Sequence, residues 1–292
     1  MRADPHQYQL VAPANLQEAL ALLNREPGQW MPIAGGTDIM VVYSAGKFPP
    51  RQLLTIAAFS ELRSIELTPD EVRIGSGTTY TDVRKHPVLS VEFPLLARSA
   101  SWTGGIANQN RGTLGGNIAN ASPAGDSLPV LLAYDAELIL ISARGERRVP
   151  YRTFHTGYKK MQLGADELIG SIILRRPPPK MFHYSRKVGA RKAQAISKVF
   201  LAAVGETTDK KVVAVRLAAG SVGPTPIRLI KTEQALLGQA LTPELIEHAR
   251  EILAQEIQPI DDIRSTAEYR IAVLGNLCAE FLHDLAQWPG TR

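Results

Sequence analysis

Two glycine-rich segments carry the residue types in this chain that point to chemistry. Residues 111–126 read RGTLGGNIANASPAGD, with three glycines beside Thr113 and Asn117, and residues 31–38 read MPIAGGTD. Glycine allows a backbone to adopt positive φ and lets another group come into contact with it. Consecutive N–H groups in such a turn form a concavity that binds anions, and Asp126 adds acceptor oxygens of the kind that a ribose hydroxyl needs. The two segments therefore predict a site for a phosphorylated nucleotide.

Each segment taken singly also has a simpler interpretation, because most glycine-rich segments are only turns. Neither is followed by Gly-Lys-Ser/Thr, and neither fits the G-x-G-x-x-G dinucleotide pattern. What the two share is a Gly-Gly pair followed closely by a hydroxyl or amide residue, and such a pair of turns would hold a diphosphate from two sides. Thr37 and Asp38 are in addition predicted to cap a short helix over residues 39–42.

The two segments resemble the flavin-binding segments of the FAD (medium) subunits of molybdenum hydroxylases, the xanthine dehydrogenase and carbon monoxide dehydrogenase family. Four further matches, FHTGY, DELIGSI, GPTPIR and DIRSTAEYR, begin at Phe154, Asp166, Gly223 and Asp262. They occur in the family's order and extend over essentially the whole chain. The resemblance implies an α+β fold: a two-subdomain FAD-binding fold of the PCMH type (vanillyl-alcohol oxidase-like), followed by a C-terminal antiparallel sheet with helices on one face.

The resemblance also implies which residues contact FAD. The diphosphate would lie between residues 33–38 and 113–117, and Asp126 would contact the adenosine half. Ala119 and Ile169 match positions next to the isoalloxazine ring, and Lys187 matches a lysine whose charge would favour the reduced ring. Thr103 stands where the family often carries an aromatic residue beside the adenine, and a threonine cannot stack on it. The cofactor-contacting residues implied in this way are Met31, Pro32, Ile33, Ala34, Gly35, Gly36, Thr37, Asp38, Thr103, Gly104, Thr113, Gly115, Gly116, Asn117, Ala119, Asp126, Ile169 and Lys187.

Three of these residues have alternative interpretations that need no cofactor. Asp126 would serve as the N-cap of a helix that starts at Ser127. Ile169 would be an ordinary core residue of a strand. Lys187 would be a solvated charge in a basic group with Arg186, Arg191 and Lys192.

The run RRPPP at residues 175–179 is the clearest domain boundary, because successive prolines favour a stiff extended connector. The sequence predicts an N-terminal α/β FAD-binding subdomain (1–57), a β-rich FAD-binding subdomain (58–178) and a C-terminal α+β domain (179–292). Within the second, one helix is predicted over residues 93–107. In the third, strands come first and helices follow, one of them over residues 243–256, which favours an antiparallel sheet covered by helices.

Composition sets limits on function and location. The 292 residues are 45% hydrophobic and 21% charged, which is typical of a soluble globular protein. The first ten residues, MRADPHQYQL, lack the apolar stretch of a signal peptide, and no run is long enough to span a membrane, so we expect a cytoplasmic protein. A net charge of +5 without any nucleic-acid motif argues against a nucleic-acid partner. The single Cys278 cannot hold an iron–sulfur cluster, which takes about four thiolates.

The function implied by the resemblance is that of an FAD-binding electron-transfer subunit. A large partner would hydroxylate a substrate at a molybdopterin centre, and a small partner would relay electrons through [2Fe–2S] clusters to FAD and on to NAD⁺ or another acceptor. The assembly would be a heterotrimer or its dimer. The sequence shows no catalytic triad, paired carboxylates or metal-ligand set. Two alternatives stay open: a stand-alone flavin oxidoreductase of the same fold, and a scaffold subunit that no longer binds FAD.

Overall fold

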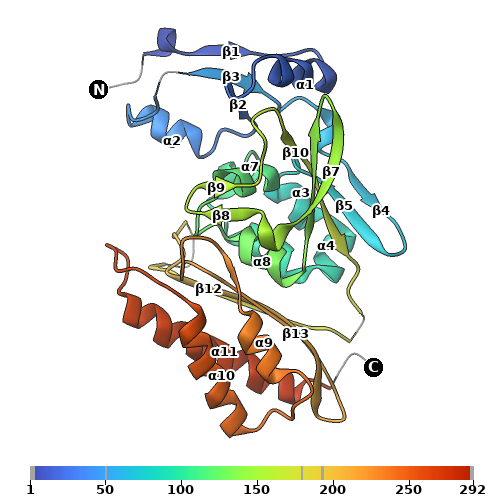
Figure 1. Cartoon of the computed structure of the whole chain (residues 1–292), viewed down its shortest axis with the longest axis vertical. Helices are drawn as coiled ribbons and strands as arrows, with labels where there is room; N and C mark the ends of the chain where they lie inside the picture. The colour runs from blue at the N-terminus through green and yellow to red at the C-terminus, as the bar shows by residue number, and fades with distance from the viewer. Residues whose placement is uncertain (1–3, 50, 179, 192–193, 290–292) are drawn as a thin grey trace.

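Three units follow one another along the long axis of the molecule (Figure 1). The computed structural model describes residues 4–49, 51–178, 180–191 and 194–289. The predicted domain limits at residues 1, 179 and 292, and Lys192 of the predicted basic group, lie outside the described residues.

The N-terminal unit is a three-stranded parallel sheet, in the order β1-β3-β2, with two helices. Helix α1 forms because Asn15 accepts a hydrogen bond from the backbone of Glu18 at its start, and Ala19, Leu22 and Leu23 repeat at helical spacing and are buried. Helix α2, by contrast, buries none of its residues. The elements are η1 (Pro5–Gln7), β1 (Gln9–Val11), α1 (Leu16–Arg25), β2 (Trp30–Ile33), α2 (Ile39–Ser44) and β3 (Gln52–Thr55).

The middle unit is built on a five-stranded antiparallel sheet in the order β4-β5-β10-β6-β7. Strand β10 (Leu168–Arg175) is central, and every residue but the last is buried, which explains its continuous apolar sequence. The other strands and short helices are η2 (Ser60–Leu62), β4 (Ile65–Leu67), β5 (Glu71–Gly75), β6 (Glu137–Ser142), β7 (Gly145–Pro150), η3 (Tyr151–Thr153), β8 (His155–Gly157) and β9 (Lys160–Met161).

Six helices lie between β5 and β6 in the sequence, so the middle unit is mixed and not simply β-rich. The single helix predicted over residues 93–107 was wrong, because Gly104 has a φ of +61° and the chain leaves the helix there. The helices are α3 (Tyr80–Lys85), α4 (Pro87–Glu92), α5 (Pro94–Trp102), α6 (Ile106–Gln109), α7 (Leu114–Asn120) and α8 (Ser127–Ala133).

The C-terminal unit is a four-stranded antiparallel sheet with helices on one face, as predicted. Alternate residues of β12 face opposite sides: Leu201 and Ala203 pack with the C-terminal helices, whereas Phe200 and Ala202 belong to the core of the middle unit. The sheet is therefore covered on both faces: the core of the middle unit extends onto one face, and a separate core lies between the other face and the C-terminal helices. The elements are β11 (Phe182–Val188), β12 (Val199–Thr208), β13 (Lys211–Gly220), β14 (Ile227–Arg228), α9 (Ile230–Leu236), α10 (Pro243–Glu256) and α11 (Ala267–Gln287).

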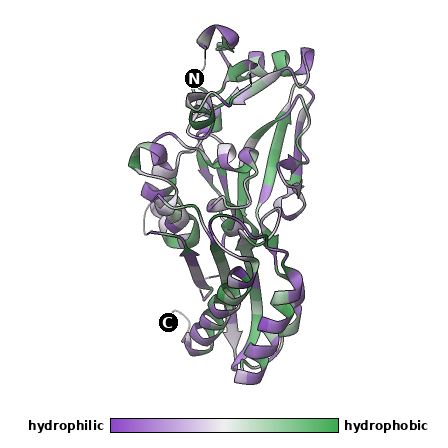
Figure 2. Cartoon of the chain, turned by 90° about the vertical axis from the view of Figure 1, so that its left-hand side faces the viewer, coloured by the Kyte–Doolittle hydropathy of each residue, from purple (hydrophilic) through white to green (hydrophobic). Residues whose placement is uncertain are grey.

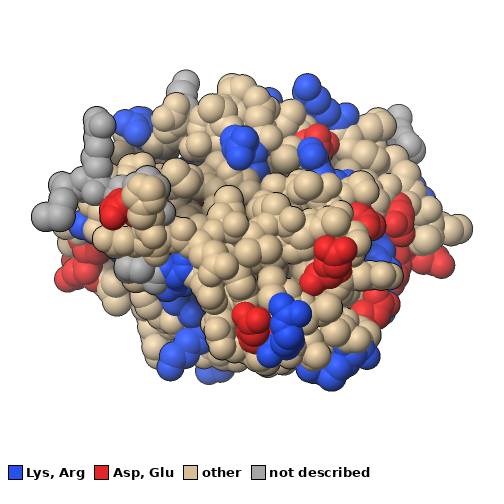
Figure 3. Space-filling view, turned by 90° about the horizontal axis from the view of Figure 1, so that it is seen from above, with Lys and Arg blue, Asp and Glu red and all other residues tan. Residues whose placement is uncertain are grey.

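Hydrophobic residues concentrate on the strands and on the inward sides of the helices (Figure 2). No helix within the described residues is long and apolar enough to cross a membrane. Viewed onto the N-terminal unit, lysines and arginines are interspersed with acidic residues over a largely uncharged surface (Figure 3). That distribution differs from the basic stripe that marks a nucleic-acid-binding face.

Candidate functional site

A cavity of about 740 Å³ lies between the N-terminal and middle units. Its size is in the range typical of small-molecule and cofactor sites. Its walls come from β2 and the following loop, from the start of α7, and from the segment between β9 and β10. Half of the predicted cofactor-contacting residues line it, namely Met31, Pro32, Ala34, Gly35, Thr113, Gly115, Gly116, Ala119 and Ile169.

The two glycine-rich segments are in direct contact at this cavity. The Arg111 guanidinium donates a hydrogen bond from Nε to the carbonyl of Gly35 at 3.2 Å. A Cβ atom added to Gly35 would lie only 1.8 Å from the carbonyl oxygen of Arg111, so the backbones approach to a distance that only glycine permits. Two segments that are far apart in the sequence thus form one wall.

Four consecutive backbone N–H groups are available in the first of these segments. Among the described residues, no hydrogen bond has the N–H of residues 35–38 as its donor. Gly36 has a φ of +71°, a left-handed conformation that turns the chain here. Asp38 makes no side-chain bond to the start of α2, so the capping role predicted for it was wrong. Unpaired amides in a turn are the donors that a phosphate group needs.

The second segment uses its N–H groups differently from the prediction. The Gly115 N–H donates to the carbonyl of Ser76 at 2.8 Å, and the Gly116 N–H donates to Oγ1 of Thr113, the N-cap of α7, at 3.0 Å. A Cβ on Gly115 would lie 2.5 Å from the Ser76 side chain, so this glycine serves close packing. Gly116 is exposed, and a Cβ there would meet only Thr113 Oγ1.

Three arginines that the sequence interpretation missed also line the cavity: Arg51, Arg63 and Arg111. Of the described lining residues, Glu167 is the only carboxylate, and Arg147 binds it through Nε at 2.6 Å and lowers its pKa. Arg63 is paired with Asp82 at 3.6 Å, so the free charge on the cavity wall comes from Arg51 and Arg111 and is positive, which suits an anionic ligand. Arg111 was detectable because it adjoins the glycines, whereas Arg51 and Arg63 carry no local signal.

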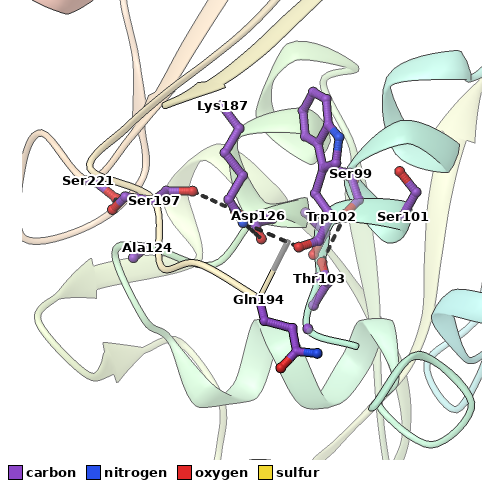
Figure 4. A network of polar contacts seen from close by, with 12 residues as sticks. Ser99, Ser101, Trp102, Thr103, Ala124, Asp126, Lys187, Gln194, Ser197 and Ser221 are labelled. Atoms are coloured by element: carbon purple, nitrogen blue, oxygen red, sulfur yellow. Dashed lines mark hydrogen bonds and ion pairs between the residues drawn. The ribbon is translucent and has the colours of Figure 1, made fainter. Parts of the chain in front are cut away.

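A second cluster joins the middle and C-terminal units (Figure 4). Asp126 accepts hydrogen bonds from Lys187 Nζ and Ser197 Oγ, both at 2.7 Å, and the side chains of Asp126 and Lys187 are only 8% and 10% exposed. Lys187 also donates to the Trp102 carbonyl at 3.3 Å. Burial raises the pKa of Asp126, while Lys187 and Ser197 act in the opposite direction.

This cluster corrects two alternatives left open by the sequence. Asp126 precedes α8 but makes no capping bond to it, and Lys187 is not a solvated charge. The remaining predicted residues also lie outside the cavity lining. Thr103 donates to the Ser99 carbonyl and lies beside the cluster in Figure 4, and Asn117 accepts a hydrogen bond from Ser127 Oγ at 2.6 Å. Outside the lining are Ile33, Gly36, Thr37, Asp38, Thr103, Gly104, Asn117, Asp126 and Lys187.

The FHTGY motif holds the C-terminal end of α7. His155 Nε2 donates to the Ile118 carbonyl at 3.0 Å, and Lys159 Nζ donates to the backbone carbonyl and, at 2.7 Å, to the side-chain Oδ1 of Asn120. The Ile118 carbonyl accepts this bond in addition to one from the Ala121 N–H at 3.0 Å, and Lys159 caps the carbonyl of Asn120, the last residue of the helix. Because Ala119 lies on the same turn and lines the cavity, the β8–β9 hairpin fixes the position of the cavity wall.

The environment of His155 predicts a pH-dependent contribution to stability. Burial lowers the pKa of His155 below the value of about 6.5 that an exposed histidine has. At acidic pH the unfolded chain therefore binds a proton at His155 that the folded chain excludes. The free energy of unfolding falls as the pH drops below about 6.5, by at most about 1.4 kcal/mol per pH unit. His155→Gln replaces the imidazole N–H with an amide N–H that can still donate but does not titrate.

Urea unfolding between pH 8 and pH 5 tests this expectation. The difference in unfolding free energy between the native chain and His155→Gln should be constant above pH 7 and should shift against the native chain as the pH falls. A difference independent of pH would show that His155 takes up its proton equally in both states.

The comparisons with known proteins agree with this architecture. Residues 6–177 match the FAD binding domain in molybdopterin dehydrogenase, and residues 184–285 match the CO dehydrogenase flavoprotein C-terminal domain. A putative xanthine dehydrogenase FAD-binding subunit of Escherichia coli (strain K12) is 32% identical over 95% of both chains. The nicotinate dehydrogenase FAD-subunit of Eubacterium barkeri is 28% identical over 90% of both.

A solved structure extends the likeness to three dimensions. Carbon monoxide dehydrogenase from Hydrogenophaga pseudoflava, in a form that lacks the Mo-pyranopterin moiety, matches with a TM-score of 0.92 and 27% identity, covering 97% of this chain and 98% of that chain. Fold and family matches together define a flavoprotein subunit of an oxidoreductase. The chain belongs to the FAD-binding medium subunits of the xanthine dehydrogenase and carbon monoxide dehydrogenase family, and the predicted fold class is confirmed.

Proposed function

We propose that this chain holds one FAD in the cavity between its N-terminal and middle units and passes electrons through it. The electrons would come from [2Fe–2S] clusters on a small partner subunit, after a large molybdopterin subunit has oxidised the substrate, and would go to NAD⁺ or another acceptor in the cytoplasm. The observation that carries the proposal is the loop of four unpaired amides, residues 35–38, whose first residue, Gly35, lines the cavity and is held against Arg111.

The residues present fit a flavin dinucleotide. The amides of residues 35–38, with Arg51, Arg63 and Arg111, would hold the diphosphate, because unpaired N–H groups and guanidinium groups are the usual partners of phosphate oxygens. Ala119 and Ile169 would pack against the isoalloxazine ring, which supplies the redox chemistry when FAD is bound.

Fewer groups are available to bind the adenosine half of FAD. Asp126 already accepts from Lys187 and Ser197, but a carboxylate has about four lone-pair sites, so a ribose hydroxyl could share it. Thr103 offers no aromatic face and donates its own hydroxyl to Ser99. We therefore place most of the binding free energy at the diphosphate and the ring.

The substrate would bind on another subunit. The relatives are named for different substrates, xanthine and nicotinate among them, although their FAD subunits match this chain over nearly its whole length. The cavity walls hold one carboxylate, which is already paired with Arg147, and no acid–base pair for substrate chemistry among the described lining residues. This argues against the stand-alone flavin oxidoreductase.

FAD titration of the purified chain tests the proposal. We expect flavin absorbance at one FAD per chain, and at least a tenfold loss of FAD affinity in Gly116→Val, because a β-branched side chain would enter the cavity from this exposed position. Glu251→Val on α10 is the control, since it places the same side chain on an exposed helical position far along the chain.

Two outcomes would reject the proposal in different ways. A folded chain that refuses added FAD would support the scaffold alternative. A yellow chain that oxidises a small molecule without any partner subunit would support the stand-alone oxidoreductase.

A further inference from the structure

One wall of the cavity is a loop that has no helix or strand of its own. This wall loop, residues 162–167, connects β9 to β10. The Gly28 N–H of the N-terminal unit donates to the Ala165 carbonyl at 3.1 Å, so the loop also contacts that unit. A loop outside any helix or sheet needs other bonds to keep a cavity wall in one position. The wall-loop residues that line the cavity are Leu163, Gly164, Ala165 and Glu167.

A single arginine of the middle sheet binds both ends of the wall loop. Arg147, on the outer strand β7, donates from Nε to one carboxylate oxygen of Glu167 at 2.6 Å and from Nη2 to the other at 2.7 Å. The same Nη2 donates to the Gln162 carbonyl at 2.8 Å, and Glu167 accepts from the Gly164 N–H at 2.7 Å. Because a guanidinium that binds a carboxylate through two bonds fixes both distance and orientation, this pair sets the path of the loop backbone.

A second ion pair attaches the wall loop to the same hairpin. Arg144, in the turn between β6 and β7, donates to both carboxylate oxygens of Asp166, at 3.2 Å for the bond from Nη2. The side chains of Asp166 and Glu167 are only 11% and 7% exposed, whereas those of the two arginines are about half exposed or more. The two carboxylates that begin the DELIGSI motif are therefore the buried ends of contacts that the arginines make from the surface.

We propose that Arg147 and Glu167 are positioning residues for FAD, because their ion pair holds the wall loop in place around the cofactor; this inference rests on the proposed function. A loop that is fixed before the ligand arrives costs less conformational entropy to order on binding. The pair should therefore act on FAD affinity and not on the chemistry of the ring. Without the Arg147 guanidinium, the loop would keep the pair between Asp166 and the largely exposed Arg144, and such pairs contribute little.

The charge of Glu167 makes it possible to separate positioning from electrostatics. In the native chain the hydrogen bond from Arg147 lowers the pKa of Glu167; burial opposes this effect, and the Gly164 N–H and Arg144 add to it. Glu167 is therefore ionised and paired above about pH 5. In the absence of Arg147, an unpaired carboxylate would lie on the wall of a cavity that is proposed to hold an anionic diphosphate. Acidic pH would then remove that charge and leave the loop unheld.

FAD titration of the full chain at neutral pH tests the inference with a matched control. Arg147→Met should lower FAD affinity at least tenfold, and Arg147→Lys, which keeps one charged donor, should recover part of the loss. Arg148→Met is the control, because Arg148 follows Arg147 on β7 and pairs with Glu71 and Glu137. None of these three control residues lines the cavity, so Arg148→Met should bind FAD as the native chain does.

Hydrogen exchange of the cofactor-free chain reports on the wall loop directly. The N–H groups of Gly164 and Glu167 are bonded within the loop. They should exchange at least tenfold faster in Arg147→Met and at the native rate in Arg148→Met. A general loss of stability would instead speed exchange across the whole middle sheet.

The outcomes separate this inference from the proposed function. If the native chain binds FAD and Arg147→Met binds it as tightly as Arg148→Met does, the inference is wrong and the proposed function stands. Full recovery of FAD affinity in Arg147→Met at pH 5 would also overturn the inference, since the loss would then come only from the unpaired charge of Glu167. A native chain that binds no FAD would reject the proposed function, and the exchange rates would still show whether Arg147 holds the loop.

Discussion

Gly35→Ala should leave the chain folded but almost devoid of FAD. The new Cβ would lie 1.8 Å from the Arg111 carbonyl oxygen and 2.4 Å from the Arg111 carbonyl carbon, so the two glycine-rich segments would have to separate. Separation would break the Arg111–Gly35 hydrogen bond and displace the loop that carries the four unpaired amides. We expect FAD affinity to fall by at least 100-fold, about 2.7 kcal/mol of binding free energy.

Gly205→Ala is a suitable control for this substitution. Its Cβ would also be crowded, at 2.7 Å from the Leu285 side chain, but it lies in the C-terminal sheet, away from the cavity. Thermal unfolding and FAD titration of the two variants should therefore diverge, with Gly205→Ala losing stability and Gly35→Ala losing FAD. Equal FAD affinity in Gly35→Ala and the native chain would show that the diphosphate does not depend on this contact.

Much of the fold could be predicted because local patterns and burial agree. The proline-rich run after β10 separates the family matches, which end at 177 and resume at 184. The helix over Pro243–Glu256 was predicted with its observed limits, since Thr242 caps it and a proline occupies its first position. The break between α5 and α6 did carry a local signal, the pair Gly104-Gly105, which the prediction of a single helix did not use; Gly104 adopts a φ of +61° there.

The candidate site was predictable in part for a similar reason. Paired glycines are a local signal, so the two segments and their neighbours were found, and the structure places nine of the residues on one cavity. The functions of individual glycines were not predictable: Gly115 packs on Ser76, a residue much earlier in the chain. Arg51 and Arg63 reach the cavity from separate loops, and no local pattern marks them.

Two of the predicted residues that lie outside the cavity lining, Asp126 and Lys187, form an ion pair with each other. Asp126 and Lys187 were expected to act on the cofactor, yet they bind each other across the seam between the middle and C-terminal units. The two charges neutralise each other, so Lys187 is not an unpaired cation of the kind that would favour the reduced flavin ring. The pair links the cavity-bearing middle unit to the sheet that carries Lys187, and stability at this seam should be its first measurable effect.

Lys187→Met should destabilise the chain by about 3–5 kcal/mol, because it leaves the Asp126 carboxylate buried without its charge partner. Asp126→Asn should cost a comparable amount by leaving the Lys187 ammonium unpaired. The double variant should recover most of the loss, since neither position then carries a charge that needs a partner. Urea unfolding of the four proteins gives the coupling energy directly.

Arg186→Met is the control, because its partner Glu280 is more than a third exposed and such a pair contributes roughly 0–1 kcal/mol. Losses that simply add in the double variant would show that the two charges do not stabilise each other, and the seam would then be held by its apolar core alone.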